Sequence, residues 1–122
     1  MTYIKRSHTL AVQAEQDWVA AGPQHQEAYA RLARQLPYML RTAGLAPTVI
    51  FLQTKTKDKE TARLLLRNLA AALGHGTQGQ GDTKALYQTA LQVDHPAAYL
   101  QLIQGALDYA VWVKRVSAGR DA

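Results

Sequence analysis

The residue types that most often carry catalysis are present in this 122-residue chain, but their spacing does not favour a reaction. No histidine has a second potential metal ligand three or four positions away, the spacing that places two side chains on one helix face. The two serines stand near the ends of the sequence, outside any nucleophile-elbow motif, and cysteine is absent. We therefore expect no enzyme activity, no metal site and no cofactor. The histidines are His8, His25, His75 and His95.

The glycine-rich segment 74–81 contains two spacings that bind phosphate in other folds. Gly74 to Gly79 has the G-x-G-x-x-G spacing of dinucleotide-binding folds, and Gly76 to Gly79 has the G-x-x-G spacing of KH domains. Both motifs need a β-sheet beside them, and no alternating apolar and polar stretch predicts one. A mobile, glycine-rich loop between two helices is the better interpretation.

Positive charge is concentrated in the middle of the chain. The net charge is +5, but residues 31–67 alone carry eight basic and two acidic side chains, hence +6. Such a segment favours contact with a polyanion through its phosphates, and arginine's planar donors suit phosphate oxygens well. The alternative is that these residues line ordinary solvated helix faces. The residues predicted to bind nucleic acid are Arg31, Arg34, Arg41, Lys55, Lys57, Lys59, Arg63 and Arg67.

The spacing of these residues predicts how they share a surface. Lys59, Arg63 and Arg67 recur every four positions, which places them in a stripe along one helix face. If the helices that carry the two halves of the set pack side by side, the set could merge into one groove. Tyr38 is the only aromatic residue near the arginines outside the predicted core, so we expect contact with the backbone and little reading of base sequence.

Apolar residues recur every three or four positions along nearly the whole chain, which predicts an all-α protein. Its length fits a single domain, residues 1–122. We expect a bundle of about six helices, with a kink or a break at Pro37 and Asp82 and Asp94 as N-caps of the last two helices. The expected helices cover residues 2–20, 24–43, 47–53, 58–73, 82–92 and 94–117.

Four of the expected helices have a face that we assign to the core. These faces are Ile4, Ala11, Ala14 and Trp18 in the first helix; Tyr29, Leu32, Leu36, Met39 and Ala43 in the second; Leu65, Leu66, Leu69 and Leu73 in the fourth; and Leu86, Ala90 and Leu91 in the fifth.

The last expected helix is apolar on two sides. This predicts either the central helix of the bundle or a helix with one side covered by another chain. The residues predicted to contact another protein are Tyr99, Leu102, Tyr109, Trp112 and Val116.

The longest apolar runs are five residues, far below the roughly 18 that cross a bilayer, and no apolar core of a signal peptide follows Lys5 and Arg6. We expect no membrane contact and a cytoplasmic location.

The run from Leu36 to Leu45, followed by Val49-Ile50-Phe51-Leu52, resembles the central signature of the small α-helical subunit of the Cmr complex, the type III-B CRISPR RNA-guided effector. The segment from Tyr99 to Arg115 is similar to that family's closing helix. The resemblance implies a non-catalytic structural subunit of a ribonucleoprotein that acts in antiviral defence. Cleavage of RNA or DNA would then belong to other subunits.

The same resemblance implies the partners. They are the large palm-domain subunit, the repeated backbone subunit and stacked copies of the chain itself, near the guide RNA and the target RNA. Three alternatives remain open. They are the small subunit of the type III-A complex, a free-standing regulator that binds nucleic acid through the basic residues, and a helical adaptor that uses only its last helix.

Overall fold

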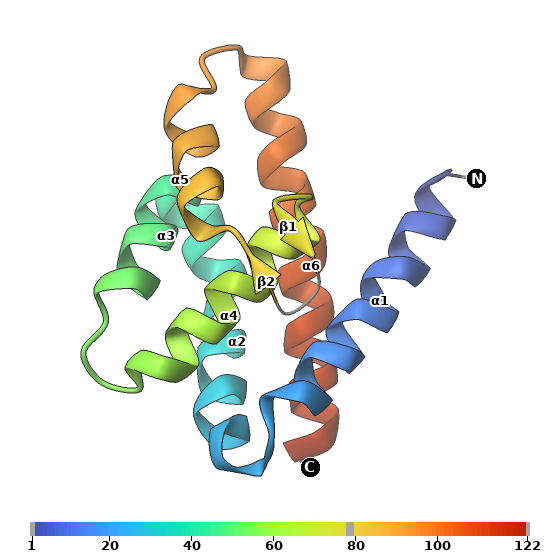
Figure 1. Ribbon diagram of the computed structural model, residues 1–122. Coiled ribbons are helices and arrows are strands. Elements are labelled where there is room, and N and C mark those ends of the chain that lie inside the picture. Colours follow the sequence, from blue (N-terminus) through green and yellow to red (C-terminus); the bar gives the residue numbers. More distant parts are fainter. Residues whose placement is uncertain (1, 78–79, 122) are drawn as a thin grey trace.

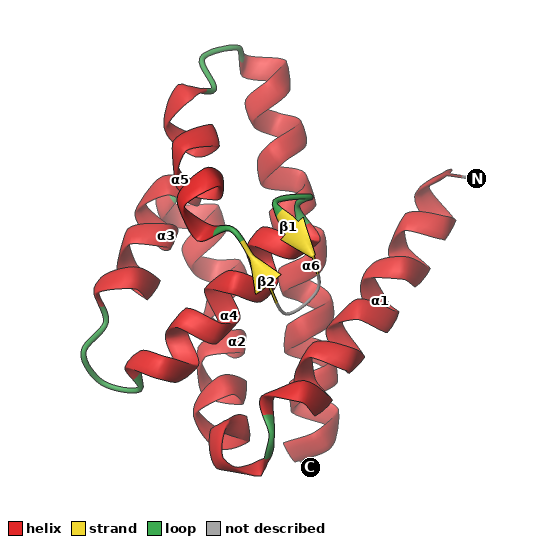
Figure 2. Ribbon diagram, viewed as in Figure 1, coloured by secondary structure: helices red, strands yellow, loops and turns green. Residues whose placement is uncertain are grey.

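The structure is a computed structural model that describes residues 2–77 and 80–121, with the side chains of residues 8–76 and 80–118. Within these residues the chain is almost entirely helical, which confirms the all-α prediction (Figures 1 and 2). The helices are α1 (Thr2–Ala21), α2 (Pro23–Ala43), α3 (Leu45–Thr54), α4 (Lys59–Ala72), α5 (Thr83–Gln92) and α6 (Pro96–Asp121). Two short strands, β1 (Gly76–Thr77) and β2 (Gln80–Gly81), pair antiparallel between α4 and α5.

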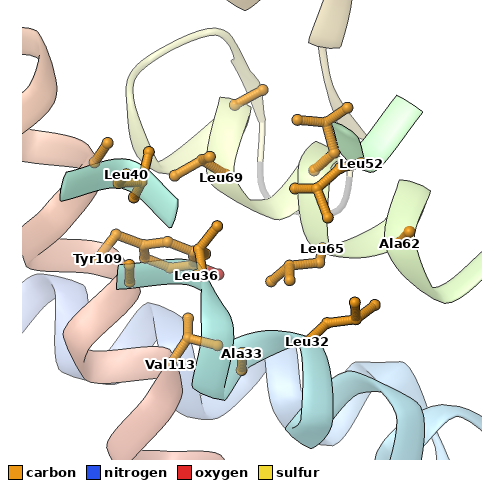
Figure 3. Packing of buried hydrophobic residues seen from close by; sticks show 14 of the residues in the cluster. Leu32, Ala33, Leu36, Leu40, Leu52, Ala62, Leu65, Leu69, Tyr109 and Val113 are labelled. Carbon is orange, nitrogen blue, oxygen red and sulfur yellow. The ribbon is translucent and has the colours of Figure 1, made fainter. Parts of the chain in front are cut away.

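Helix α6 runs the full height of the molecule and packs against α1, α2 and α4. The N-terminal half of α1 extends away from the other helices, while its C-terminal half leads into α2 (Figure 1). Figure 3 shows side chains of α2, α4 and α6 turned toward one another in the core. They include Leu36 and Leu40 of α2, Leu65 and Leu69 of α4, and Tyr109 and Val113 of α6, all fully buried.

Helix α2 continues through Pro37, so of the two outcomes expected there, a kink or a break into two helices, the break does not occur. Proline removes one intrahelical hydrogen bond and crowds the preceding turn, at a cost of about 3 kcal/mol. Here Pro37 is buried between Leu36 and Leu40, and the apolar area that this turn removes from water offsets that cost. The expected core face of α2 is confirmed for Tyr29, Leu32 and Leu36.

Two residues at helix ends were assigned to the core incorrectly. Ala43, in the last turn of α2, is exposed, and Leu91, in the last turn of α5, is 59% exposed. Leu86 and Ala90 of α5 are buried as expected, and the side chain of Ile4 lies outside the described residues.

Helix starts follow local hydrogen bonding. Asp82 is the N-cap of α5, because its carboxylate accepts a hydrogen bond from the Ala85 amide at 3.0 Å, as expected. Asp94 is not the N-cap of α6, because that helix begins at Pro96. His95 takes the cap position, and its Nδ1 accepts a hydrogen bond from the Ala97 amide at 3.2 Å. Proline suits the first helical position because its missing N–H has no intrahelical partner there.

The glycine-rich segment 74–81, which was predicted to be a mobile loop, contains two short paired strands in its described part. Gly76 pairs with Gly81 across the two short strands, and β2 lies directly on α4. A Cβ on Gly81 would overlap the Arg67 carbonyl oxygen and lie 2.9 Å from the Ala71 nitrogen. Only glycine permits this close approach of two backbones. Residues 78–79, which complete both phosphate-binding spacings, lie outside the described residues.

No helix in the part of the chain that the structure describes is both long enough and apolar enough to span a bilayer.

Candidate nucleic-acid interface

The predicted basic stripe on α4 lies on the solvent side of that helix. Lys59, Arg63 and Arg67 are exposed, whereas the opposite face of α4 is buried in the core. The periodicity that buries Leu65 and Leu69 is thus the same one that turns the three cations outward. Among the described residues, neither Arg63 nor Arg67 forms an ion pair.

Arg31 is already partnered. Its Nη2 lies 3.0 Å from Oδ2 of Asp58, and this ion pair joins α2 to the residue just before α4. Asp58 adopts a left-handed conformation with φ of 57°, and its carboxylate makes no capping bond to α4. The two side chains are 42% and 27% exposed, so the pair adds less than about 1 kcal/mol of stability. It does, however, neutralise the charge of Arg31.

The other predicted cations are spread over α2 and the segment between α3 and α4. Lys57, Arg34 and Arg41 are exposed, while half-buried Lys55 places Nζ 5.4 Å from the centre of the Phe51 ring. Helices α2 and α4 do contact each other, as a shared surface requires. Arg41 follows Arg31 by ten residues, about 15 Å along α2. A common groove would therefore have to run about half the length of that helix.

A pocket that the sequence did not reveal lies beside the α4 stripe. It measures about 310 Å³ and is lined by Gln53 of α3, Arg63, Leu66 and Arg67 of α4, and Thr83 of α5. Neither Gln53 nor Thr83 stands in a motif, so sequence reasoning had no signal for them. Only the N-cap at Asp82 marked where α5 would begin. The pocket brings two of the predicted cations together with two neutral hydrogen-bonding side chains.

The predicted protein interface needs one correction. Tyr109 is fully buried, and its hydroxyl donates a hydrogen bond to the Asp17 carboxylate of α1, so it has no surface for another chain. Leu102, Trp112 and Val116 are half-buried against this chain's own core. The wide apolar face of α6 thus serves largely as the centre of the bundle. For Tyr99, Leu102, Trp112 and Val116, contact with another protein stays a prediction.

A buried polar network at the centre of the bundle also escaped sequence reasoning. Besides the contact between Tyr109 and Asp17, the Asn68 amide donates to the Tyr29 hydroxyl at 2.9 Å. Burial raises the pKa of Tyr29 and of Tyr109 well above the usual value, and the negative charge of Asp17 raises both further. The network joins α1, α2, α4 and α6, and none of its four residues lines the pocket beside the α4 stripe. It serves packing.

The histidines do not approach one another to form a site. His25 Nδ1 lies 2.8 Å from the Thr61 hydroxyl, a contact between α2 and α4, and His95 caps α6. Within the described residues, no three His, Cys, Asp or Glu side chains gather into a group that could hold a metal ion.

The sequence and the fold are both similar to those of known proteins. Residues 6–120 match the family model described as "CRISPR-associated protein (Cas_Cmr5)". The fold is similar to the X-ray crystal structure of a CRISPR-associated Cmr5 family protein from Thermus thermophilus, with a TM-score of 0.79 and 29% sequence identity. That alignment covers 93% of this chain and 95% of the other. No curated protein matches the sequence.

Proposed function

This chain belongs to the CRISPR-associated Cmr5 family and is a subunit of a Cmr (type III-B) CRISPR complex, and within that complex we propose that it is a non-catalytic structural subunit that supports binding of guide and target RNA. In this role it stacks along the complex between the large palm-domain subunit and the repeated backbone subunit, beside copies of itself. The complex acts in antiviral defence, and the expected site of action is the cytoplasm.

The exposed cations of α4 carry the RNA part of this proposal. Arg63 and Arg67 present guanidinium groups to solvent with no acidic partner in the described part of the chain. Desolvating an ion pair would oppose binding, so unpaired cations are better placed to take up phosphates. Two exposed aromatic side chains of α2 and α3 could offer a stacking surface for a base, Tyr38, which is 70% exposed, and Phe51, which is 41% exposed and contacts Lys55. The sequence had indicated only Tyr38.

A non-catalytic role is supported by how the reactive side chains are used. Asp17, a buried carboxylate, is held by the Tyr109 hydroxyl. His25 and His95 are occupied in contacts that position helices. A general acid or base must reach a substrate, whereas Asp17 and His25 face neighbouring helices and His95 is engaged by the helix that it caps.

Affinity purification tests this function. We expect a tagged copy expressed in its native host to recover the other Cmr subunits together with short guide RNAs that carry repeat sequence. Recovery of the chain alone, or with unrelated proteins and no guide RNA, would overturn the structural-subunit proposal. In that case a free-standing nucleic-acid regulator would become the better explanation, and such a protein should bind RNA tightly as an isolated symmetric dimer.

Removing the partner of Arg31 should strengthen RNA binding. In Asp58→Asn the side chain still tolerates the left-handed backbone, because asparagine adopts it more readily than most residues, but Arg31 loses its counter-charge. One more phosphate contact should make the logarithmic salt dependence of single-stranded RNA binding steeper by about 0.7. Fluorescence anisotropy of purified protein over a salt series measures this slope.

Glu60→Gln is the matched control for Asp58→Asn. It removes one negative charge two residues away, from an exposed side chain that is not the partner of Arg31. An equal change of slope in both variants would show that net charge alone, and not the release of Arg31, governs the affinity.

A further inference from the structure

The pocket between α3, α4 and α5 combines the features of an anion site. Its lining includes Gln53 at the end of α3, Thr83 at the start of α5 and the buried Leu66 of α4, which contributes apolar surface. Arg63 and Arg67 stand one helical turn apart on α4 and both line it. We propose that this is a phosphate-binding pocket that holds one phosphodiester group of the RNA, a proposal that rests on the proposed function for the source of the phosphate.

The charge balance of the pocket favours a bound anion. Two guanidinium groups four residues apart on a helix repel each other, and among the described residues no carboxylate pairs with either. Two acidic residues stand close to the lining along the chain. Asp82 precedes Thr83, and Oδ1 of its carboxylate is engaged by the Ala85 amide, while exposed Glu60 lies three residues before Arg63 without an ion pair to it. Neither carboxylate lines the pocket, so its described lining carries two positive charges and no negative one, and a phosphate would relieve the repulsion.

The lining offers donors for phosphate oxygens and little for a base. Each guanidinium presents five N–H donors in a planar fork that matches phosphate geometry. The Gln53 amide and the Thr83 hydroxyl add donors from α3 and α5. Among the described residues no aromatic side chain lines the pocket, so a base would find no stacking surface there. A volume of about 310 Å³ lies at the lower end of ligand pockets and suits one phosphate with part of its sugar.

The close contact between Gly81 and α4 fixes one wall of this pocket in advance. Gly81 packs on the Arg67 carbonyl oxygen and the Ala71 nitrogen, and Thr83 follows two residues later. The segment that carries Thr83 is therefore held against the same turn of α4 that carries Arg67. A preformed site loses less entropy on binding than one assembled from mobile side chains and loops.

The test compares two double variants of the full chain. Arg63→Gln with Arg67→Gln removes both pocket cations. Arg34→Gln with Lys59→Gln removes two exposed cations outside the pocket, one of them on the same helix. We expect the pocket variant to bind a single-stranded RNA oligonucleotide about tenfold more weakly than wild type, since charged hydrogen bonds are lost, and the control about threefold. Circular dichroism should show the same melting temperature for both variants.

A titration with inorganic phosphate tests the phosphate pocket separately from the proposed function in RNA binding. We expect phosphate to shift the NMR signals of the Arg63 and Arg67 side-chain N–H groups and not that of Arg34. Equal loss of RNA affinity in both double variants, or no response of either pocket arginine to phosphate, would overturn the pocket and leave the proposed function standing. Shifts at Arg63 and Arg67 in a protein that binds no RNA would confirm the phosphate site and overturn RNA as its source.

Discussion

Above about pH 10, the free energy of unfolding should fall by about 2.7 kcal/mol for each further pH unit, because two buried tyrosines resist ionisation. In the unfolded chain Tyr29 and Tyr109 lose their protons near the usual pKa of about 10. In the folded protein, burial holds both pKa values well above it. The folded state therefore keeps two protons that the unfolded state has released. Stability from these groups is complete below the unfolded pKa and is lost as the pH rises past it.

Urea unfolding at a series of alkaline pH values measures this slope. In Tyr29→Phe one titrating group is gone, so the slope should halve to about 1.4 kcal/mol per pH unit. Tyr38→Phe removes a hydroxyl from a side chain that is 70% exposed, and it should keep the wild-type slope. If all three proteins lost stability at the same rate, the two tyrosines would not be the groups that govern alkaline unfolding.

Burial could be predicted from the sequence wherever it depends on the periodicity of a single helix. Tyr29, Leu32 and Leu36 recur at helical spacing in the middle of α2 and are all buried, as their periodicity predicted. The same rule failed for Leu91, because burial at a helix end depends on how far the neighbouring elements extend. Pro37 shows a related limit of predictions that rest on local conformational preference. The helix continues through it because tertiary packing outweighs a local cost.

Some features of the candidate site could likewise be predicted from the sequence, and others could not. The stripe of Lys59, Arg63 and Arg67 could be read from the sequence because its geometry lies within one helix. The ion pair of Arg31 spans 27 residues, and the contact between Tyr109 and Asp17 spans 92. No spacing rule links residues that far apart, so their pairing appears only once the helices are packed.

A substitution in the glycine-rich segment is the most direct test of the packing that surrounds the pocket. Gly81→Ala should destabilise the protein by about 3 kcal/mol, because the new Cβ would overlap a backbone oxygen of α4 and neither backbone can move independently. β2 would then have to separate from α4 and take the Thr83 wall of the pocket with it. We therefore expect weaker RNA binding in the same variant, even at temperatures where it remains folded.

Gly74→Ala is the matched control for this change, and urea unfolding with RNA anisotropy measures both variants. Gly74 has a φ of +90°, yet a Cβ there meets no atom within 4 Å. Its replacement should cost only the backbone strain of a left-handed residue, about 1 to 2 kcal/mol, and leave RNA affinity unchanged. Equal costs at the two positions would mean that contact with α4 does not constrain Gly81. The contact of Gly81 would then not explain how Thr83 is held beside Arg67, and the packing of α5 on α4 would have to hold it instead.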